Sequence, residues 1–76
     1  MERYKLQSQA AAQQVDMRYA AGPSIFYIRF DFDDQSVDMP IDRDKLASLL
    51  ESFPREHEVI VEEKGKTLVI IPNQRK

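Results

Sequence analysis

The sequence predicts an α+β domain in which an N-terminal helix is followed by a β-hairpin, a second helix and a second β-hairpin (αββαββ). The sheet is expected to be small, rich in antiparallel pairs and packed on the helices. Three patterns support this prediction. Apolar and polar side chains alternate from residue 25 to residue 41, which is the period of half-buried strands. The apolar spacing then becomes helical up to residue 53, and two runs of β-branched residues flank a Lys-Gly pair near the C-terminus.

Residues 1–23 form a segment rich in Gln and Ala, which are residues that helices tolerate well. A helix is expected from about Glu2 to Ala20, because Gly22 can take a left-handed C-terminal position and Pro23 blocks continuation. The apolar stripe of this helix is thin, so the helix is expected either to pack on a partner or to fray in solution. The stripe consists of Leu6, Ala10 and Met17.

The first hairpin is predicted from two alternating stretches in residues 24–72, the expected globular core. The strand Ile25–Phe32 turns four apolar side chains to one face: Phe26, Ile28, Phe30 and Phe32. A second strand, Val37–Ile41, follows a connection of turn-forming Asp, Gln and Ser residues. Pro40 has no N–H to donate to a neighbour, so this second strand is expected at a sheet edge.

The central helix is predicted from Leu46, Leu49, Leu50 and Phe53, which recur at helical spacing before Pro54. Asp42 is the expected N-cap, with its carboxylate accepting hydrogen bonds from the first-turn amides. Ile41 and Leu46 have the spacing of a hydrophobic staple around that cap. The apolar side of this helix is expected to pack on the apolar face of the first hairpin.

The second hairpin is predicted from strands at residues 58–62 and 67–71, with Lys64 and Gly65 at its tip. If Glu63 opposes Lys66, one face carries Val59, Val61, Leu68 and Ile70, and the other carries Ile60, Val69 and Ile71. Both faces of this hairpin are apolar, and the central helix can pack on only one of them. The N-terminal helix or another chain is therefore expected on the second face. The predicted apolar contact set for a partner is Ile60, Val69, Ile71, Leu6 and Met17.

A chain of 76 residues without Cys has little core and no disulfide to reinforce it. Oligomerisation then supplies further burial, and a homodimer is predicted through helix pairing or strand addition at a sheet edge. The lack of Cys fits a reducing cytoplasm, and the polar N-terminus does not have the pattern of a signal peptide. With no apolar run of about 18 residues, a cytoplasmic protein without membrane contact is expected.

The net charge of −2 hides a strong segregation of charge along the chain. Residues 31–44 contain six aspartates and one arginine. This acidic run either steers a cationic partner toward the protein or simply keeps the protein soluble. The predicted acidic rim of a partner site is Asp31, Asp33, Asp34, Asp38 and Asp44. Lys64, Lys66, Arg75 and Lys76 make the C-terminal part basic, and residues 73–76 are expected to be a disordered tail.

Chemistry-bearing motifs are weak, and no catalytic, cofactor or metal site is predicted. His57 lies between two glutamates, but no nucleophile motif accompanies it. Counting from Asp31, the sixth and twelfth residues are Ser36 and Asp42, whereas a calcium loop needs Gly and Glu there. Two glycines do not make a phosphate-binding loop.

The leading functional hypothesis is therefore a small, non-enzymatic and self-associating protein-interaction module, acting as an adaptor or inhibitor of a larger protein. The alternative is a regulator directed at nucleic acid. The acidic run would then imitate a nucleic-acid backbone, as small phage and plasmid inhibitors can, or the basic tail would contact phosphates. The aromatic strand itself lacks the Lys and Arg that accompany stacking aromatics in RNA-binding sheets, and acids follow it instead.

Overall fold

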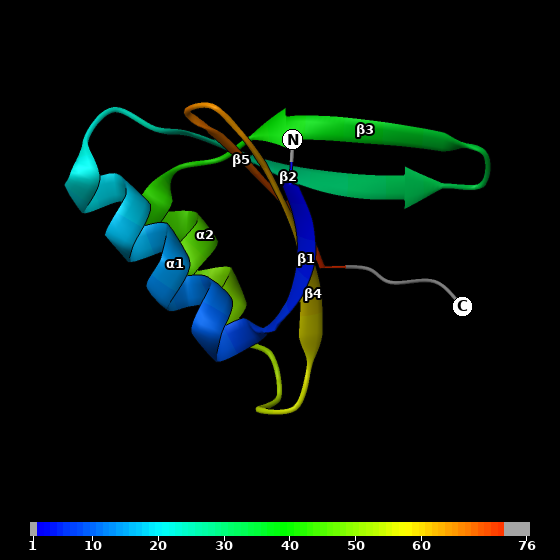
Figure 1. The fold of residues 1–76 in the computed structure, drawn as a ribbon. Coiled ribbons are helices and arrows are strands. Elements are labelled where there is room, and N and C mark those ends of the chain that lie inside the picture. The colour runs from blue at the N-terminus through cyan, green and yellow to red at the C-terminus, as the bar shows by residue number, and fades with distance from the viewer. Residues whose placement is uncertain (1, 73–76) are drawn as a thin grey trace.

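The computed structural model describes residues 2–72 and shows an α+β fold, with two helices on a five-stranded mixed sheet (Figure 1). The predicted class is correct, but a strand precedes the first helix, so the order is βαββαββ. The elements are β1 (Glu2–Gln7), α1 (Ser8–Ala21), β2 (Ile25–Phe32), β3 (Gln35–Pro40), α2 (Arg43–Glu51), β4 (Glu58–Lys64) and β5 (Thr67–Ile71).

The strands lie in the order β1-β4-β5-β2-β3. β2 and β5 are parallel, and the other three neighbouring pairs are antiparallel. Two hairpins therefore lie side by side, β1 extends the sheet at one edge, and β3 forms the other edge, as Pro40 predicts. Both helices cover the same face of the sheet (Figure 1).

The predicted helix over the first residues is wrong for Glu2–Gln7, which form an edge strand on β4. Tyr4 lies opposite Val61 and Leu6 lies opposite Val59, so both side chains point to the helix-covered face. Tertiary pairing with β4 outweighs the weak local preference for helix, because Tyr4 and Leu6 then bury apolar surface and the strand completes a ladder of backbone hydrogen bonds.

α1 packs on its own domain, against α2, through a face of small side chains. The buried residues are Ser8, Ala11, Ala12 and Val15, whereas Met17 of the predicted stripe is 66% exposed. The stripe was misplaced because it included Leu6, which belongs to β1. Small residues on the buried face let the two helix backbones approach closely, so a thin apolar stripe suffices for docking.

A polar cluster fastens α1 to β1 and β4. Tyr4 Oη donates to Glu63 Oε2 at 2.7 Å, and Gln14 Nε2 donates to the same oxygen at 2.9 Å. Arg18 lies 3.6 Å from that carboxylate and also donates to the Gly65 carbonyl. Burial, together with the hydrogen bond to Glu63, raises the pKa of Tyr4 to about 12.

The core lies between the helices and the centre of the sheet. Its largest fully buried side chains include Leu46, Leu50, Leu68 and Ile70. Ile41 packs against the cluster that contains Leu46, in keeping with the predicted staple. Asp42 stands at the N-cap, but its side chain makes no capping hydrogen bond, so that part of the prediction is wrong.

The second hairpin has the predicted faces but a different register. Lys64 opposes Thr67 and Val61 opposes Ile70, so the two-residue loop is Gly65-Lys66 rather than Lys64-Gly65. Gly65 has φ +57°, and it takes the first loop position, where a tight hairpin turn needs a positive φ. The predicted register was off by an even number of residues, which leaves every side chain on its predicted face.

The sequence predicts a division of the chain at residue 23, between the Gln- and Ala-rich segment and the globular core. This division stays a prediction. The tail predicted for residues 73–76 lies outside the described residues. Among residues 2–72, no helix has the length and apolar character needed to cross a membrane.

Ala11→Leu is expected to lower the free energy of unfolding by about 1–3 kcal/mol, because Ala11 is fully buried where the helices meet and a larger side chain must push α1 away. Ala20→Leu, at an exposed position of the same helix, is the matched control and should change stability by less than about 0.5 kcal/mol. Urea unfolding followed by circular dichroism measures both. Equal effects of the two substitutions would contradict the close packing of α1.

Tyr4→Phe is expected to lower the free energy of unfolding by about 1 kcal/mol at pH 8, through loss of the bond to Glu63. The pKa of Tyr4 is raised in the fold, so its contribution is complete below its unfolded pKa of about 10 and is lost as the pH rises through about 12. The difference between wild type and variant should therefore shrink over that range. The same substitution can be measured in a Glu63→Gln background. If the stability lost through Tyr4→Phe depends on pH as steeply there as in the wild type, the role assigned to Glu63 is contradicted.

Candidate interaction surface

The first hairpin extends beyond the helix that was expected to cover it. The eight residues of β2 span about 26 Å, whereas the nine residues of α2 span about 13 Å. The outer part of the β2–β3 hairpin consequently projects from the body of the domain (Figure 1). All six residues of β3 are exposed.

Apolar side chains occupy the helix-facing side of this projecting hairpin. The register places Phe30 beside Val37 and Ile28 beside Met39, on the same side as the buried Phe26. Of the six large apolar side chains that are most exposed in residues 2–72, three lie here, namely Phe32 (58%), Met39 (49%) and Val37 (39%). We call Phe30, Phe32, Val37 and Met39 the hairpin face.

The hairpin face corrects the predicted core. Phe26 and Ile28 are buried, as expected, but Phe30 is only half-buried and Phe32 is exposed. α2 runs only from Arg43 to Glu51 and leaves Phe30 half-covered and Phe32 uncovered. The last two apolar positions of the strand therefore form surface instead of core.

A groove lies next to the hairpin face, between the hairpin and the C-terminal end of α2. Its volume is about 290 Å³, and we call it the α2 groove. The Phe53 and His57 rings lie 4.4 Å apart, and His57 Nε2 is 3.1 Å from the Pro72 carbonyl oxygen, so the residues of the far wall contact one another. The lining residues are Ile28, Phe30, Leu49, Phe53, His57 and Pro72.

The groove and the hairpin face form one continuous apolar surface. Phe30 belongs to both, and its ring lies 6.4 Å from that of Phe32. Sequence reasoning assigned Phe30, Leu49 and Phe53 to the core and did not find the surface. The lengths of β2 and α2 were the signal that could have revealed this surface. A strand with four apolar positions on one face is longer than a helix of nine residues.

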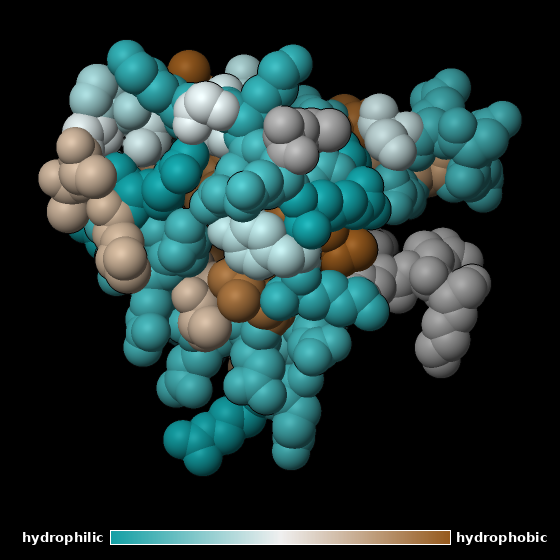
Figure 2. Space-filling view, in the orientation of Figure 1, coloured by the Kyte–Doolittle hydropathy of each residue, from teal (hydrophilic) through white to brown (hydrophobic). Residues whose placement is uncertain are grey.

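The predicted acidic rim is divided among separate places. Asp33 and Asp34 form the hairpin turn, with Asp33 at φ +51°, and Asp31 accepts a 2.7 Å hydrogen bond from Ser36. In Figure 2, the projecting hairpin ends in hydrophilic surface. The other two rim residues lie elsewhere: Asp38 pairs with Arg29, and Asp44 lies 3.3 Å from Arg43 at the start of α2.

The opposite face of the sheet carries a network of charges. Glu62 Oε2 accepts from Arg3 Nη1 at 2.7 Å and from Arg29 Nη1 at 3.0 Å. Arg29 also donates to both carboxylate oxygens of Asp38, at 2.7 and 3.2 Å. The Glu62 side chain is only 7% exposed, so the network ties four strands together with its central carboxylate shielded from water.

This network also shifts the ionisation of its members. The hydrogen bonds to Arg29, and then its positive charge, hold the pKa of the Asp38 carboxyl below its usual value despite some burial. Asp38, followed by Glu62, raises the pKa of Arg29 above its already high value. Both groups therefore remain charged and paired at neutral pH.

The predicted apolar contact residues do not come together. Val69 and Ile71 lie on the face opposite the helices but are only 8% and 4% exposed, and Ile60 beside them is half-buried. Leu6 is half-buried on the helix-covered face, and Met17 stands exposed on α1. No described helix covers the face that carries Ile60. That a partner contacts these five apolar residues stays a prediction.

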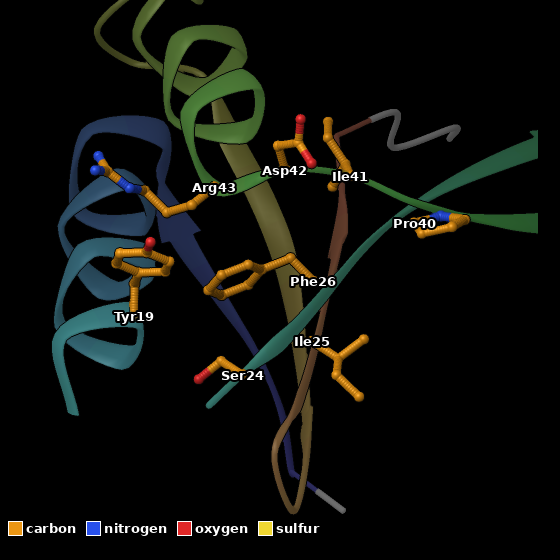
Figure 3. A pocket seen from close by; sticks show the side chains of 8 residues that line it. All are labelled: Tyr19, Ser24, Ile25, Phe26, Pro40, Ile41, Asp42 and Arg43. Carbon is orange, nitrogen blue, oxygen red and sulfur yellow. The ribbon is translucent and has the colours of Figure 1, made fainter. Parts of the chain in front are cut away.

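A second hollow, of about 340 Å³, lies where α1, β2, β3 and α2 meet (Figure 3). Arg43 and Tyr19 face one another on one side of it, with the guanidinium 5.0 Å from the ring centre. Arg43 also lies 3.4 Å from Asp16 of α1. These contacts join the end of α1 to the start of α2, which is a structural role.

Within residues 2–72, no three His, Asp or Glu side chains gather in a way that would hold a metal ion. His57 packs on Phe53 and contacts the Pro72 carbonyl, which makes it part of the groove wall. Comparisons with protein-family models, with curated proteins and with solved structures found no match. The surface itself must therefore carry the functional argument.

Asp38→Asn is expected to lower the free energy of unfolding at pH 7 by up to about 1 kcal/mol, because it weakens a partly exposed bidentate pair. The pKa of Asp38 is lowered in the fold, so its stabilisation is present above its unfolded pKa of about 3.9 and is lost as the pH falls below it. The two proteins should converge in stability as the pH falls below that unfolded value and Asp38 becomes protonated in the folded protein as well. In an Arg29→Met background the substitution should have no effect, and an undiminished effect there would contradict this pairing.

Proposed function

We propose that the protein is a non-enzymatic interaction module that binds a larger protein, as an adaptor or inhibitor, through the hairpin face and the α2 groove. One observation carries the proposal: Phe32, Met39 and Val37 stand exposed next to Phe30 and Ile28, which line an apolar groove. Small domains rarely leave contiguous apolar surface in water unless it binds something.

The composition of this surface supports a protein partner. Aromatic residues and Met are enriched at the centres of protein interfaces, where each buries a large area at modest entropic cost. Four of the residues concerned are of these types: Phe30, Phe32, Phe53 and Met39. Strands and a helix hold the groove open, so little ordering is needed when a partner binds.

The opposite face of the sheet is a weaker candidate. Its principal charges already satisfy each other in the Arg3–Glu62–Arg29–Asp38 network. A partner there would gain little from charges that are already paired, and Val69 and Ile71 have little surface left to bury.

The nucleic-acid alternative has less support than the protein-binding proposal. A backbone mimic needs a row of free carboxylates, whereas here Asp38 and Asp44 are paired with arginines and only Asp33 and Asp34 share the hairpin tip. The other version relies on four basic residues of the C-terminal part. Lys64 precedes the second hairpin turn and Lys66 lies in it, whereas Arg75 and Lys76 lie outside the described residues.

A pull-down from lysate of the source cells, with mass spectrometry of the eluate, tests the proposal. The wild-type protein should retain a stoichiometric protein partner, and the double variant Phe32→Ser, Met39→Ser should lose it. Met17→Ser removes an apolar side chain on α1 that is even more exposed, at 66%, and should retain the partner. Circular dichroism checks that all three proteins fold.

Salt distinguishes the two functional classes. An apolar contact should survive a change from about 50 to 200 mM salt, whereas a contact with phosphates weakens steeply. A partner retained equally by the double variant, an empty eluate, or a set of proteins removed by nuclease would each overturn the proposal.

A further inference from the structure

We infer that a second copy of this chain occupies the surface, with the hairpin face of each protomer packed into the α2 groove of the other about a two-fold axis. The inference rests on the proposed function, in that it takes the hairpin face and the α2 groove to be an interface. It goes further by identifying a second copy as an occupant of that interface, which a larger partner would have to displace, and by naming the residues that meet.

The surface is self-complementary, as a two-fold interface requires. Phe32 is a projecting apolar side chain, 58% exposed, and the groove beside it is a hollow of about 290 Å³. A cavity of about 150 Å³ already holds a benzene ring. The groove of one protomer therefore admits the Phe32 ring of the other with room for Met39 beside it.

The helix layer has space for the partner's hairpin. α1 and α2 cover the sheet only as far as part of β2, and all six residues of β3 are exposed. Sheets stack about 10 Å apart, which is also the diameter of a helix. A second hairpin lying antiparallel over the first would thus sit at the height of α2 and bring Phe32 toward Ile28 and Leu49.

Charges at the two ends of the surface are complementary. Lys45 lies one helical turn before Leu49, so it shares the flank of α2 that borders the groove. Among residues 2–72, Lys45 makes no ion pair, and neither do Asp33 and Asp34 at the hairpin tip. In the antiparallel arrangement each acidic tip lies near the Lys45 of the other protomer, which forms the same contact twice.

This mode differs from both predicted routes to a dimer. The Ile41 N–H donates to the Phe26 carbonyl at 3.0 Å, which fixes the alternation of the β2–β3 ladder and turns the nitrogen of Pro40 toward the free edge. The β3 edge then lacks the donor of residue 40 and also carries Asp38, so strand addition at β3 is disfavoured. Pairing through α1 would use Met17, which lines neither the α2 groove nor the hollow beside Tyr19.

Analytical ultracentrifugation of the full chain over a wide concentration range tests the inference. The wild type should show a reversible monomer–dimer equilibrium. Phe32→Ser should raise the dimer dissociation constant at least about tenfold, whereas Met17→Ser should leave it unchanged. Since both side chains are more than half exposed, folding is expected to be retained, and thermal unfolding checks this.

Charge reversal tests the arrangement itself. Asp34→Lys and Lys45→Asp should each weaken the dimer several-fold, and the double variant should restore it. Because the chain has no Cys, a protein carrying both Asp34→Cys and Lys45→Cys should form a covalent dimer on oxidation. Asp34→Cys alone should not, because the two tips lie at opposite ends of the interface.

Each outcome separates this inference from the proposed function. A wild type that stays monomeric, or a dimer insensitive to Phe32→Ser, overturns the second copy as occupant. If such a monomer still retains a protein that the hairpin double variant loses, the proposed function stands without the dimer. A Phe32-dependent dimer that retains no other protein supports the inference and overturns the adaptor or inhibitor function. Failure of the double charge reversal to restore the dimer contradicts the antiparallel arrangement.

Discussion

The parallel pairing of β2 with β5 is the contact on which the rest of the fold depends. It joins two hairpins, each formed locally, into one sheet, with Phe26 beside Leu68 and Ile28 beside Ile70. β5 becomes the central strand, and its residues Leu68–Ile71 are all buried. The same pairing leaves β3 at an edge and gives β4 an unpaired side, which β1 then occupies. An isolated hairpin is marginal in water, so this long-range contact supplies the cooperativity of the domain.

The arrangement of the helices follows from that sheet. α2 connects the two hairpins and α1 packs against it, so both lie on one face of the sheet, with α1 against β1 and β4 and α2 against β2 (Figure 1). No described helix covers the opposite face of the sheet. There, Arg3 and Arg29 pair with the buried carboxylate of Glu62. Removing one partner from such a pair leaves an uncompensated charge, so this face serves stability first. The candidate interface lies instead where the cover of α2 ends.

Much of the local structure was predictable because it depends on side-chain direction alone. Period two along Ile25–Phe32 and helical spacing in Leu46, Leu49 and Leu50 place the strand, the helix and their inner faces. The faces of the second hairpin survive even the wrong register, since a shift by an even number of residues preserves them. Of the candidate interface, the sequence indicated that Phe30, Leu49 and Phe53 lie on one side of the sheet, but not that water reaches them.

By itself, the sequence determined the α+β class, the central helix, both hairpins and the edge position of the strand with Pro40, because each follows from local periodicity and backbone chemistry. Only the tertiary structure decided that Glu2–Gln7 is a strand, since its pairing partner lies more than fifty residues away. It also decided the parallel β2–β5 contact and the docking of α1 through small residues. It decided, too, that Phe32 lies at the surface: the lengths of the long strand and the short helix can be read in the sequence, but their relative placement cannot.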